Sequence, residues 1–175
     1  AAAARKGIDR LGWSKSQQQL RDRVNFIRPA EPESWPDLSD ETLATTVEDW
    51  LAPFLHDATT LSAIDAERLG AALDALLPYS ARARLDREAP THFVAPTGNA
   101  HPIRYEGEGA PFLAIRVQEL FGLKTHPALA NGKLPLTLEL LSPAQRPIRS
   151  TRDLPRFWAG SWADVRADLR GRYPK

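Results

Sequence analysis

The chain contains no cysteine and no methionine among its 175 residues. The missing cysteine excludes disulfides, thiolate zinc sites and cysteine nucleophiles, and it is compatible with a reducing cytoplasm, where we expect this protein. No apolar run approaches the ~18 residues that a membrane span needs. The alanine-rich start lacks the long apolar segment of a signal peptide. Because methionine is absent even from the first position, we expect a piece of a longer chain.

The motifs of several enzyme classes are also missing. There is no glycine-rich loop ending in Lys-Ser/Thr to cradle phosphates, no Asp-Glu-x-His run for magnesium and no Gly-x-Ser-x-Gly elbow. The densest glycine pair, in Gly107-Glu108-Gly109, lies between acids and predicts a hairpin turn. We therefore expect no catalytic residue, no cofactor, and neither binding nor hydrolysis of ATP by this chain.

The net charge of +1 conceals a strong asymmetry along the chain. Residues 1–30 carry +5, residues 31–74 carry −10, residues 75–141 carry +1 and residues 142–175 carry +5. An acidic block cannot face a nucleic acid, whereas the two basic ends can. Two interpretations stay open: the basic ends bind phosphates, or the acidic block neutralises them.

Residues 1–89 have the patterns of a helical lobe. Apolar residues recur there at helical spacing, and serines or aspartates stand where helices should begin. Three prolines predict an acidic linker at about residues 29–38, which Trp35 should pin to the core. Pro53 should end or kink the helix in which it lies. We expect helices after the capping-box pair Ser14 and Gln17, after Ser39, from near Asp65 and over residues 79–88.

The sequence pattern changes at Pro90, where short apolar segments begin to alternate with turn residues. One helical turn at Gln118–Phe121 should stop at Gly122. Two helices, capped by Thr151 or Asp153 and by Ser161, should close the chain. Strands are expected over Thr91–Ala95, Ile103–Glu106, Phe112–Val117, Leu134–Leu140 and, at a sheet edge, Pro147–Ser150. The predicted fold class is α+β: a helical lobe over 1–89, then over 90–175 a small, mostly antiparallel sheet or open barrel with two C-terminal helices.

The four histidines do not form a recognisable metal site. None shows the i, i+4 pairing of a helical metal site. His92 and His101 can lie on neighbouring strands and meet across a turn, but two histidines without a cysteine or a nearby acid make a poor zinc site. We therefore predict no metal, and a hydrogen-bonded strand residue at His92.

The C-terminal end of the chain carries the strongest signal. From residue 142 onward eight lysines and arginines face three aspartates, with aromatic residues interleaved. Planar cations beside flat rings suit phosphates and bases, although an aromatic helical core covered by arginine stems would give the same spacing. The stiff loop Ser142–Pro147 either satisfies its own backbone or presents Arg146. The candidate nucleic-acid-binding residues are Arg146, Arg149, Arg152, Trp158, Arg166, Arg170, Arg172 and Tyr173.

Several motifs of this region also resemble a known family. They are Pro90–His92, Val94–Gly98, Val117–Gly122, Leu140–Pro147, Thr151–Leu154, Phe157-Trp158 and Arg170–Lys175. In this order they resemble the C-terminal region of HrpB-type bacterial ATP-dependent helicases, which are similar to the DEAH/RHA group of RNA helicases. The resemblance is strong from about Glu48 to Lys175, and the family pattern continues beyond Lys175.

The resemblance implies an accessory domain that follows the ATPase core of a helicase. ATP and magnesium would belong to the parent, and the helicase core and RNA would be the partners, with no membrane involved. The leading hypothesis is a module that adds RNA affinity through the arginines, with Trp158 and Tyr173 as stacking residues if they are exposed. The alternative is a scaffold that docks on the helicase core without binding RNA.

Overall fold

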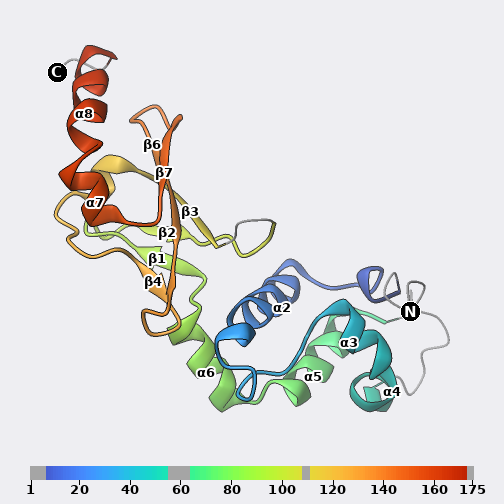
Figure 1. The fold of residues 1–175 in the computed structure, drawn as a ribbon. Helices are drawn as coiled ribbons and strands as arrows, with labels where there is room; N and C mark the ends of the chain where they lie inside the picture. Colours follow the sequence, from blue (N-terminus) through green and yellow to red (C-terminus); the bar gives the residue numbers. More distant parts are fainter. Residues whose placement is uncertain (1–6, 55–63, 108–110, 173–175) are drawn as a thin grey trace. The chain divides into compact units, whose positions relative to one another are not determined.

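The computed structural model describes residues 7–54, 64–107 and 111–172. The chain divides into two compact units, Ala1–Ala89 and Pro90–Lys175, and the division falls where the sequence pattern changes. The described part of the first unit is helical, and the second combines short strands with C-terminal helices, so the predicted α+β class is confirmed (Figure 1). Some predictions fall outside the described part. They concern the histidine His56, the hairpin turn at Glu108 and Gly109, and the candidate stacking residue Tyr173.

The helices of unit 1 begin where their capping residues predict. Ser14 accepts a hydrogen bond from the Gln17 N–H while the Gln17 side chain accepts one from the Ser14 N–H, which completes the capping box. Ser39 and Asp65 cap the next helices through their side chains in the same way. The elements are α2 Lys15–Ile27, η1 Arg28–Ala30, α3 Asp40–Thr45, α4 Val47–Trp50, η2 Ala52–Phe54, α5 Ala66–Leu76 and α6 Tyr79–Glu88.

One helix boundary differs from the prediction. The apolar stripe after Ser39 was expected to form a helix broken at Pro53, but the helix already breaks at Thr46, where φ is −111° and ψ is 17°. The Thr46 hydroxyl donates to the Thr42 carbonyl at 2.7 Å. The Thr46 N–H bonds to the same carbonyl, and α3 ends here, before Pro53 is reached. Side-chain bonds of this kind often bend helices.

The acidic linker is held by arginines of unit 1. Arg21, which is almost fully buried, donates to the Leu38 carbonyl and pairs with Asp40 at 2.5 Å. Arg84 of α6 pairs with Glu31, and its guanidinium lies 5.0 Å from the ring centroid of the buried Trp35. Trp35 therefore pins the linker as predicted, and part of the acidic block neutralises the basic residues of its own unit.

The described residues of unit 2 form three small sheets and two C-terminal helices. The order in the largest sheet is β3-β6-β7, with β3 parallel and β7 antiparallel to the central strand. Strands β1 and β2 pair antiparallel, and so do β4 and β5. The elements are β1 His92–Val94, β2 Ala100–Pro102, β3 Phe112–Arg116, η4 Val117–Leu120, β4 Ala128–Leu129, β5 Leu134–Pro135, β6 Thr137–Leu141, β7 Pro147–Thr151, α7 Leu154–Ala159 and α8 Trp162–Arg172.

Two strands differ in extent from their predictions. The strand expected at Ile103–Glu106 lies earlier, at β2, because the tight turn before it, with Gly98 at φ +91°, fixes its register against β1. Among the described residues that follow β2, Arg104 forms an isolated bridge to Phe112. The strand expected at Leu134–Leu140 is divided into β5 and β6. Its alternation is nonetheless real, since every second residue from Leu136 to Leu140 is a buried leucine.

The sheet β3-β6-β7 and helix α7 share the core of unit 2. Five of its side chains are each at most 1% exposed: Leu138 and Leu140 of β6, Leu113 and Ile115 of β3, and Leu154 of α7. Figure 1 shows α8 and the β6–β7 hairpin extending from the same end of this unit. Along the described chain, every helix is too short or too polar to cross a bilayer.

Candidate nucleic-acid interface

The turn between β6 and β7 presents Arg146 from an ordered backbone. Ser142 is buried, its N–H donates to the Arg146 carbonyl at 2.8 Å, and its hydroxyl accepts from the Arg146 N–H at 3.2 Å. Gln145 adopts a left-handed φ of +62° and its N–H donates to the Ser142 carbonyl. Ser142 thus satisfies the turn backbone, as one interpretation predicted, while the Arg146 side chain remains exposed.

Strand β7 brings Arg149 to the start of α8. Arg149 lies opposite Leu140 in the sheet register, and its Nη1 donates to the Ser161 hydroxyl at 2.6 Å. Arg152 is exposed in the short connection to α7. That connection is ordered by Asp153, whose side chain accepts from the Arg156 N–H and caps α7. The choice between Thr151 and Asp153 as the cap is therefore decided for Asp153.

Helix α8 separates its charges. At 100° per residue, Arg166 and Arg170 follow Trp162 along one side of the helix, whereas Asp164 and Asp168 lie on the opposite side. Arg166 and Arg170 are exposed, and Arg172 lies 3.9 Å from Asp168. Within the described part of the chain, this is the one ion pair that the predicted C-terminal arginines make. These cations are available to a ligand that carries negative charge.

The aromatic side chains of α7 and α8 are neither all core nor all surface. Phe157 is buried, whereas Trp158 and Trp162 are half-buried. The two indoles meet edge to face, with ring centroids 5.4 Å apart and planes at 87°. Phe121, which follows η4, is 51% exposed and lies 5.4 Å from Trp162 and 6.0 Å from Trp158 between centroids. The cluster is thus built on a buried ring and opens towards solvent.

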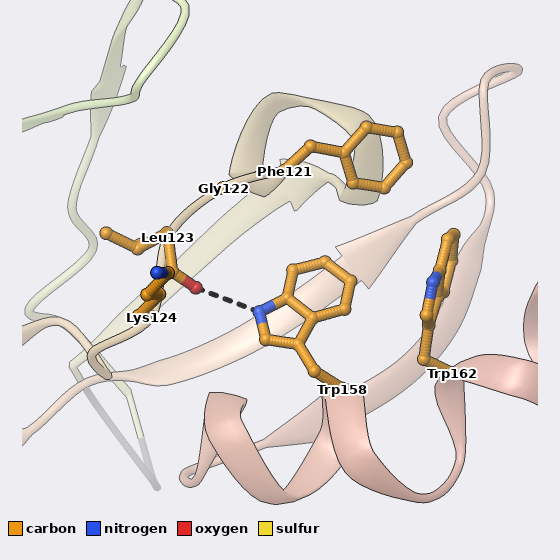
Figure 2. A pocket seen from close by; sticks show the side chains of 6 residues that line it. All are labelled: Phe121, Gly122, Leu123, Lys124, Trp158 and Trp162. Carbon is orange, nitrogen blue, oxygen red and sulfur yellow. Dashed lines mark hydrogen bonds between the residues drawn. The ribbon is translucent and has the colours of Figure 1, made fainter.

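These rings border a pocket of about 320 Å³. The Trp158 indole N–H donates to the Leu123 carbonyl at 2.9 Å, which fixes the ring against the loop opposite (Figure 2). Gly122 turns that loop with a φ of +89°, as its predicted role as a helix stop requires. The lining residues are Phe121, Gly122, Leu123, Lys124, Trp158 and Trp162.

A buried carboxylate holds the element that leads into this loop. In η4, Glu119 accepts hydrogen bonds from Asn99 Nδ2 at 2.6 Å and Thr97 Oγ1 at 2.8 Å, and its second oxygen lies 2.6 Å from His101 Nε2. The bond from Asn99 holds the pKa of Glu119 below its ordinary value of 4.5, although burial opposes the shift. The Thr97 bond and the charges of His101 and Arg116 lower the pKa further.

His126 anchors α7 from the other side. Its Nδ1 accepts from the Leu154 N–H at 3.0 Å, and its Nε2 lies 2.6 Å from the Leu136 carbonyl. A carbonyl can only accept, so Nε2 donates to it. His126 therefore joins the first residue of α7 to the junction between β5 and β6.

Sequence reasoning named Trp158 but missed Phe121, Lys124, Glu119 and His126. Their neighbours in the structure are distant in the sequence, such as Asn99 for Glu119 and Trp158 for the pocket residue Lys124, so no local pattern announces them. The stop glycine after η4 was the single available sign that a loop begins there.

The two histidines that could have met across a turn do not meet. His92 and His101 do lie on paired strands, but His101 is opposite Phe93, so the two histidines point to opposite faces. His92 is exposed and contacts the Thr91 hydroxyl at 2.9 Å, as a hydrogen-bonded strand residue. The described residues contain no group of three histidines or carboxylates that could hold a metal ion.

The fold and the motifs together define a helicase-associated region. Residues 50–175 match the model of the HrpB_C family, the ATP-dependent helicase C-terminal region, and the chain belongs to this family. The ATP-dependent RNA helicase HrpB of Escherichia coli K12 is 43% identical over 171 residues, which are 97% of this chain and 21% of the relative. The family resemblance expected from the sequence is confirmed.

Two solved structures are similar throughout most of the chain. The E. coli DExH-box NTPase HrpB has a TM-score of 0.81 and 42% identity, over 94% of this chain and 20% of its own. The E. coli DEAH/RHA helicase HrpB has a TM-score of 0.73 and 41% identity, over 94% of this chain and 21% of its own. The chain thus spans about one fifth of the length of these relatives.

Proposed function

We propose that this chain is a non-catalytic accessory domain of an ATP-dependent RNA helicase and contributes nucleic-acid affinity. Family membership and the name of the E. coli relative support the helicase setting. In this proposal ATP and magnesium are held by the motor of the parent protein, the helicase core is an intramolecular partner, and the location is cytoplasmic.

The observation that carries RNA binding is the charge pattern beside the aromatic cluster. Arg166 and Arg170 are exposed on the side of α8 that also carries Trp162, and the aspartates of this helix lie on the other side. Two further cations come from the same unit: Arg146 in the β6–β7 turn, and Arg149 of β7, which contacts Ser161 just before α8. Arginine binds phosphates well because its guanidinium is planar, permanently charged and weakly hydrated.

We expect binding of a labelled single-stranded RNA to weaken steeply with salt in fluorescence anisotropy. Each phosphate contact adds roughly 0.7 to the log–log slope for single strands, so the double variant Arg166→Ala/Arg170→Ala should lower the slope by about 1.4. The matched control is Arg10→Ala/Arg87→Ala, which removes the same charge from exposed positions of unit 1. Binding that ignored salt, or that fell equally in both double variants, would contradict the proposal.

A docking role on the helicase core is the second candidate. It is favoured by the half-exposed Phe121, which extends the aromatic cluster to the surface. Exposed apolar patches of this kind often mark protein contacts. Under this alternative the chain binds no RNA at low salt but associates tightly with separately produced motor domains, which pull-down and calorimetry would measure.

A further inference from the structure

The pocket beside α7 and α8 has the size and the walls of a site for one flat ring. Its volume of about 320 Å³ is at the lower end of small-molecule pockets, which span roughly 300–1000 Å³, so it is too small for a duplex. Trp158 and Trp162 form two walls at 87° to each other, and Phe121 closes towards both (Figure 2). An inserted ring therefore meets a face of one indole and the edge of another.

The walls of the pocket are held in place before any ligand arrives. The bond from Trp158 to the Leu123 carbonyl fixes one indole to the facing loop. The buried Glu119 holds η4, from which this loop departs, and His126 holds the first residue of α7. A preformed site loses little conformational entropy when it binds.

Charge around the pocket decides what kind of ring it suits. Lys124 is the one ionisable residue of the lining, and Arg166 lies one turn beyond Trp162 on the same side of α8, followed by Arg170. An apolar peptide segment would use the rings but not this run of cations. A base attached to a phosphate chain uses both, because its ring stacks while its phosphates meet the lysine and arginines.

We propose that the pocket receives a single unpaired nucleobase of a single-stranded nucleic acid. The base stacks on the face of the Trp162 indole and meets the tilted Phe121 ring at its edge. Lys124 and Arg166 neutralise the phosphates on either side. This inference rests on the proposed function and deepens it, because it names unpaired bases as the feature that this surface recognises. Duplex ends without an unpaired base would not enter.

The test compares two short labelled RNA strands of equal length, one with bases and one abasic throughout. We expect the complete chain to bind the abasic strand about 5- to 100-fold more weakly, since one base–aromatic stack accounts for a difference of that size. A 2-aminopurine placed in the normal strand should lose fluorescence on binding, which reports stacking directly.

Two pocket variants and one control sharpen this test. Trp162→Leu should weaken binding of the normal strand by about 5- to 100-fold, remove the 2-aminopurine quenching and leave the abasic affinity unchanged. Phe121→Ala, at a half-exposed loop position, tests the same point should Trp162→Leu fail to fold. Tyr79→Ala removes an aromatic ring that is 88% exposed in unit 1 and should change nothing.

The outcomes separate the two proposals. Equal affinity for the two strands, with wild-type quenching absent, would overturn base insertion and leave salt-dependent phosphate binding intact. No binding of either strand at low salt would overturn the proposed function and base insertion with it. A preference for the normal strand that both pocket variants retain would mean that the bases stack on other rings. It would overturn the assignment of base binding to this pocket.

Discussion

At the residue scale, buried polar side chains of unit 2 hold the elements that form the pocket. Glu119 takes its hydrogen bonds from the turn between β1 and β2, twenty or more residues earlier in the chain. Its carboxylate therefore joins the β1–β2 hairpin to η4 and to the loop of the pocket. Buried charges are tolerated where several donors satisfy them, and this one has two hydrogen-bond donors and an imidazole.

We expect Glu119→Gln to lower the free energy of unfolding by about 1–3 kcal/mol at neutral pH. The folded-state pKa of Glu119 is depressed below 4.5, so its contribution is complete above about pH 4.5 and is lost as the pH falls through the lower folded value. Urea unfolding of both proteins from neutral pH down to about pH 3 should therefore show their difference shrinking.

The control for this experiment is Glu106→Gln, an exposed carboxylate of the same unit. It should leave stability nearly unchanged at every pH. A Glu119→Gln difference that stayed constant across the acid range would show that packing, and not the charge of the carboxylate, stabilises this contact.

At the element scale, α7 is a six-residue helix and cannot be stable through its own hydrogen bonds. It is held by the Asp153 cap, by burial of Leu154 and Phe157, and by the His126 ring at its first residue. Since α7 carries Trp158, these contacts also position one wall of the pocket.

Replacing His126 with phenylalanine keeps a ring but removes both nitrogens, which leaves the Leu154 N–H and the Leu136 carbonyl without partners. We expect His126→Phe to cost about 1–3 kcal/mol of stability and to speed hydrogen exchange of the Leu154 amide. His92→Phe, at an exposed strand position, is the matched control. Unchanged exchange at Leu154 in the His126 variant would refute this anchoring role.

At the scale of the whole molecule, each unit buries its own hydrophobic core. Leu73 of α5 and Leu138 of β6 are both 0% exposed, one in each unit. The charges are also divided, since arginines of unit 1 pair with its acidic linker whereas those at the end of unit 2 stay exposed. A net charge near zero therefore does not prevent one part of the molecule from attracting phosphates.

Leu138→Ala should destabilise unit 2 by about 2–5 kcal/mol because it leaves a cavity in a packed core. We expect faster hydrogen exchange in β6 and β7 and unchanged protection in α2 and α5. The reciprocal variant Leu73→Ala should show the opposite pattern. Loss of protection in both units with either substitution would mean that the chain unfolds as one cooperative body.

The sequence by itself determined the features that local chemistry controls. Ser14, Ser39 and Asp65 cap helices because a short polar side chain reaches its own next turn. The alternating leucines of β6 fix which face of the strand is buried, and Gly122 stops η4 where a left-handed residue is required. The family motifs added the helicase context.

The tertiary structure alone decided the rest. The register of β2 and the division of the leucine strand follow from how the strands pair, which no local pattern specifies. The pocket depends on Phe121, Lys124 and two tryptophans, which meet only when the loop after η4 packs against α7 and α8. Spacing along a chain specifies which residues share a face of one element, but contacts between elements are set by how those faces pack.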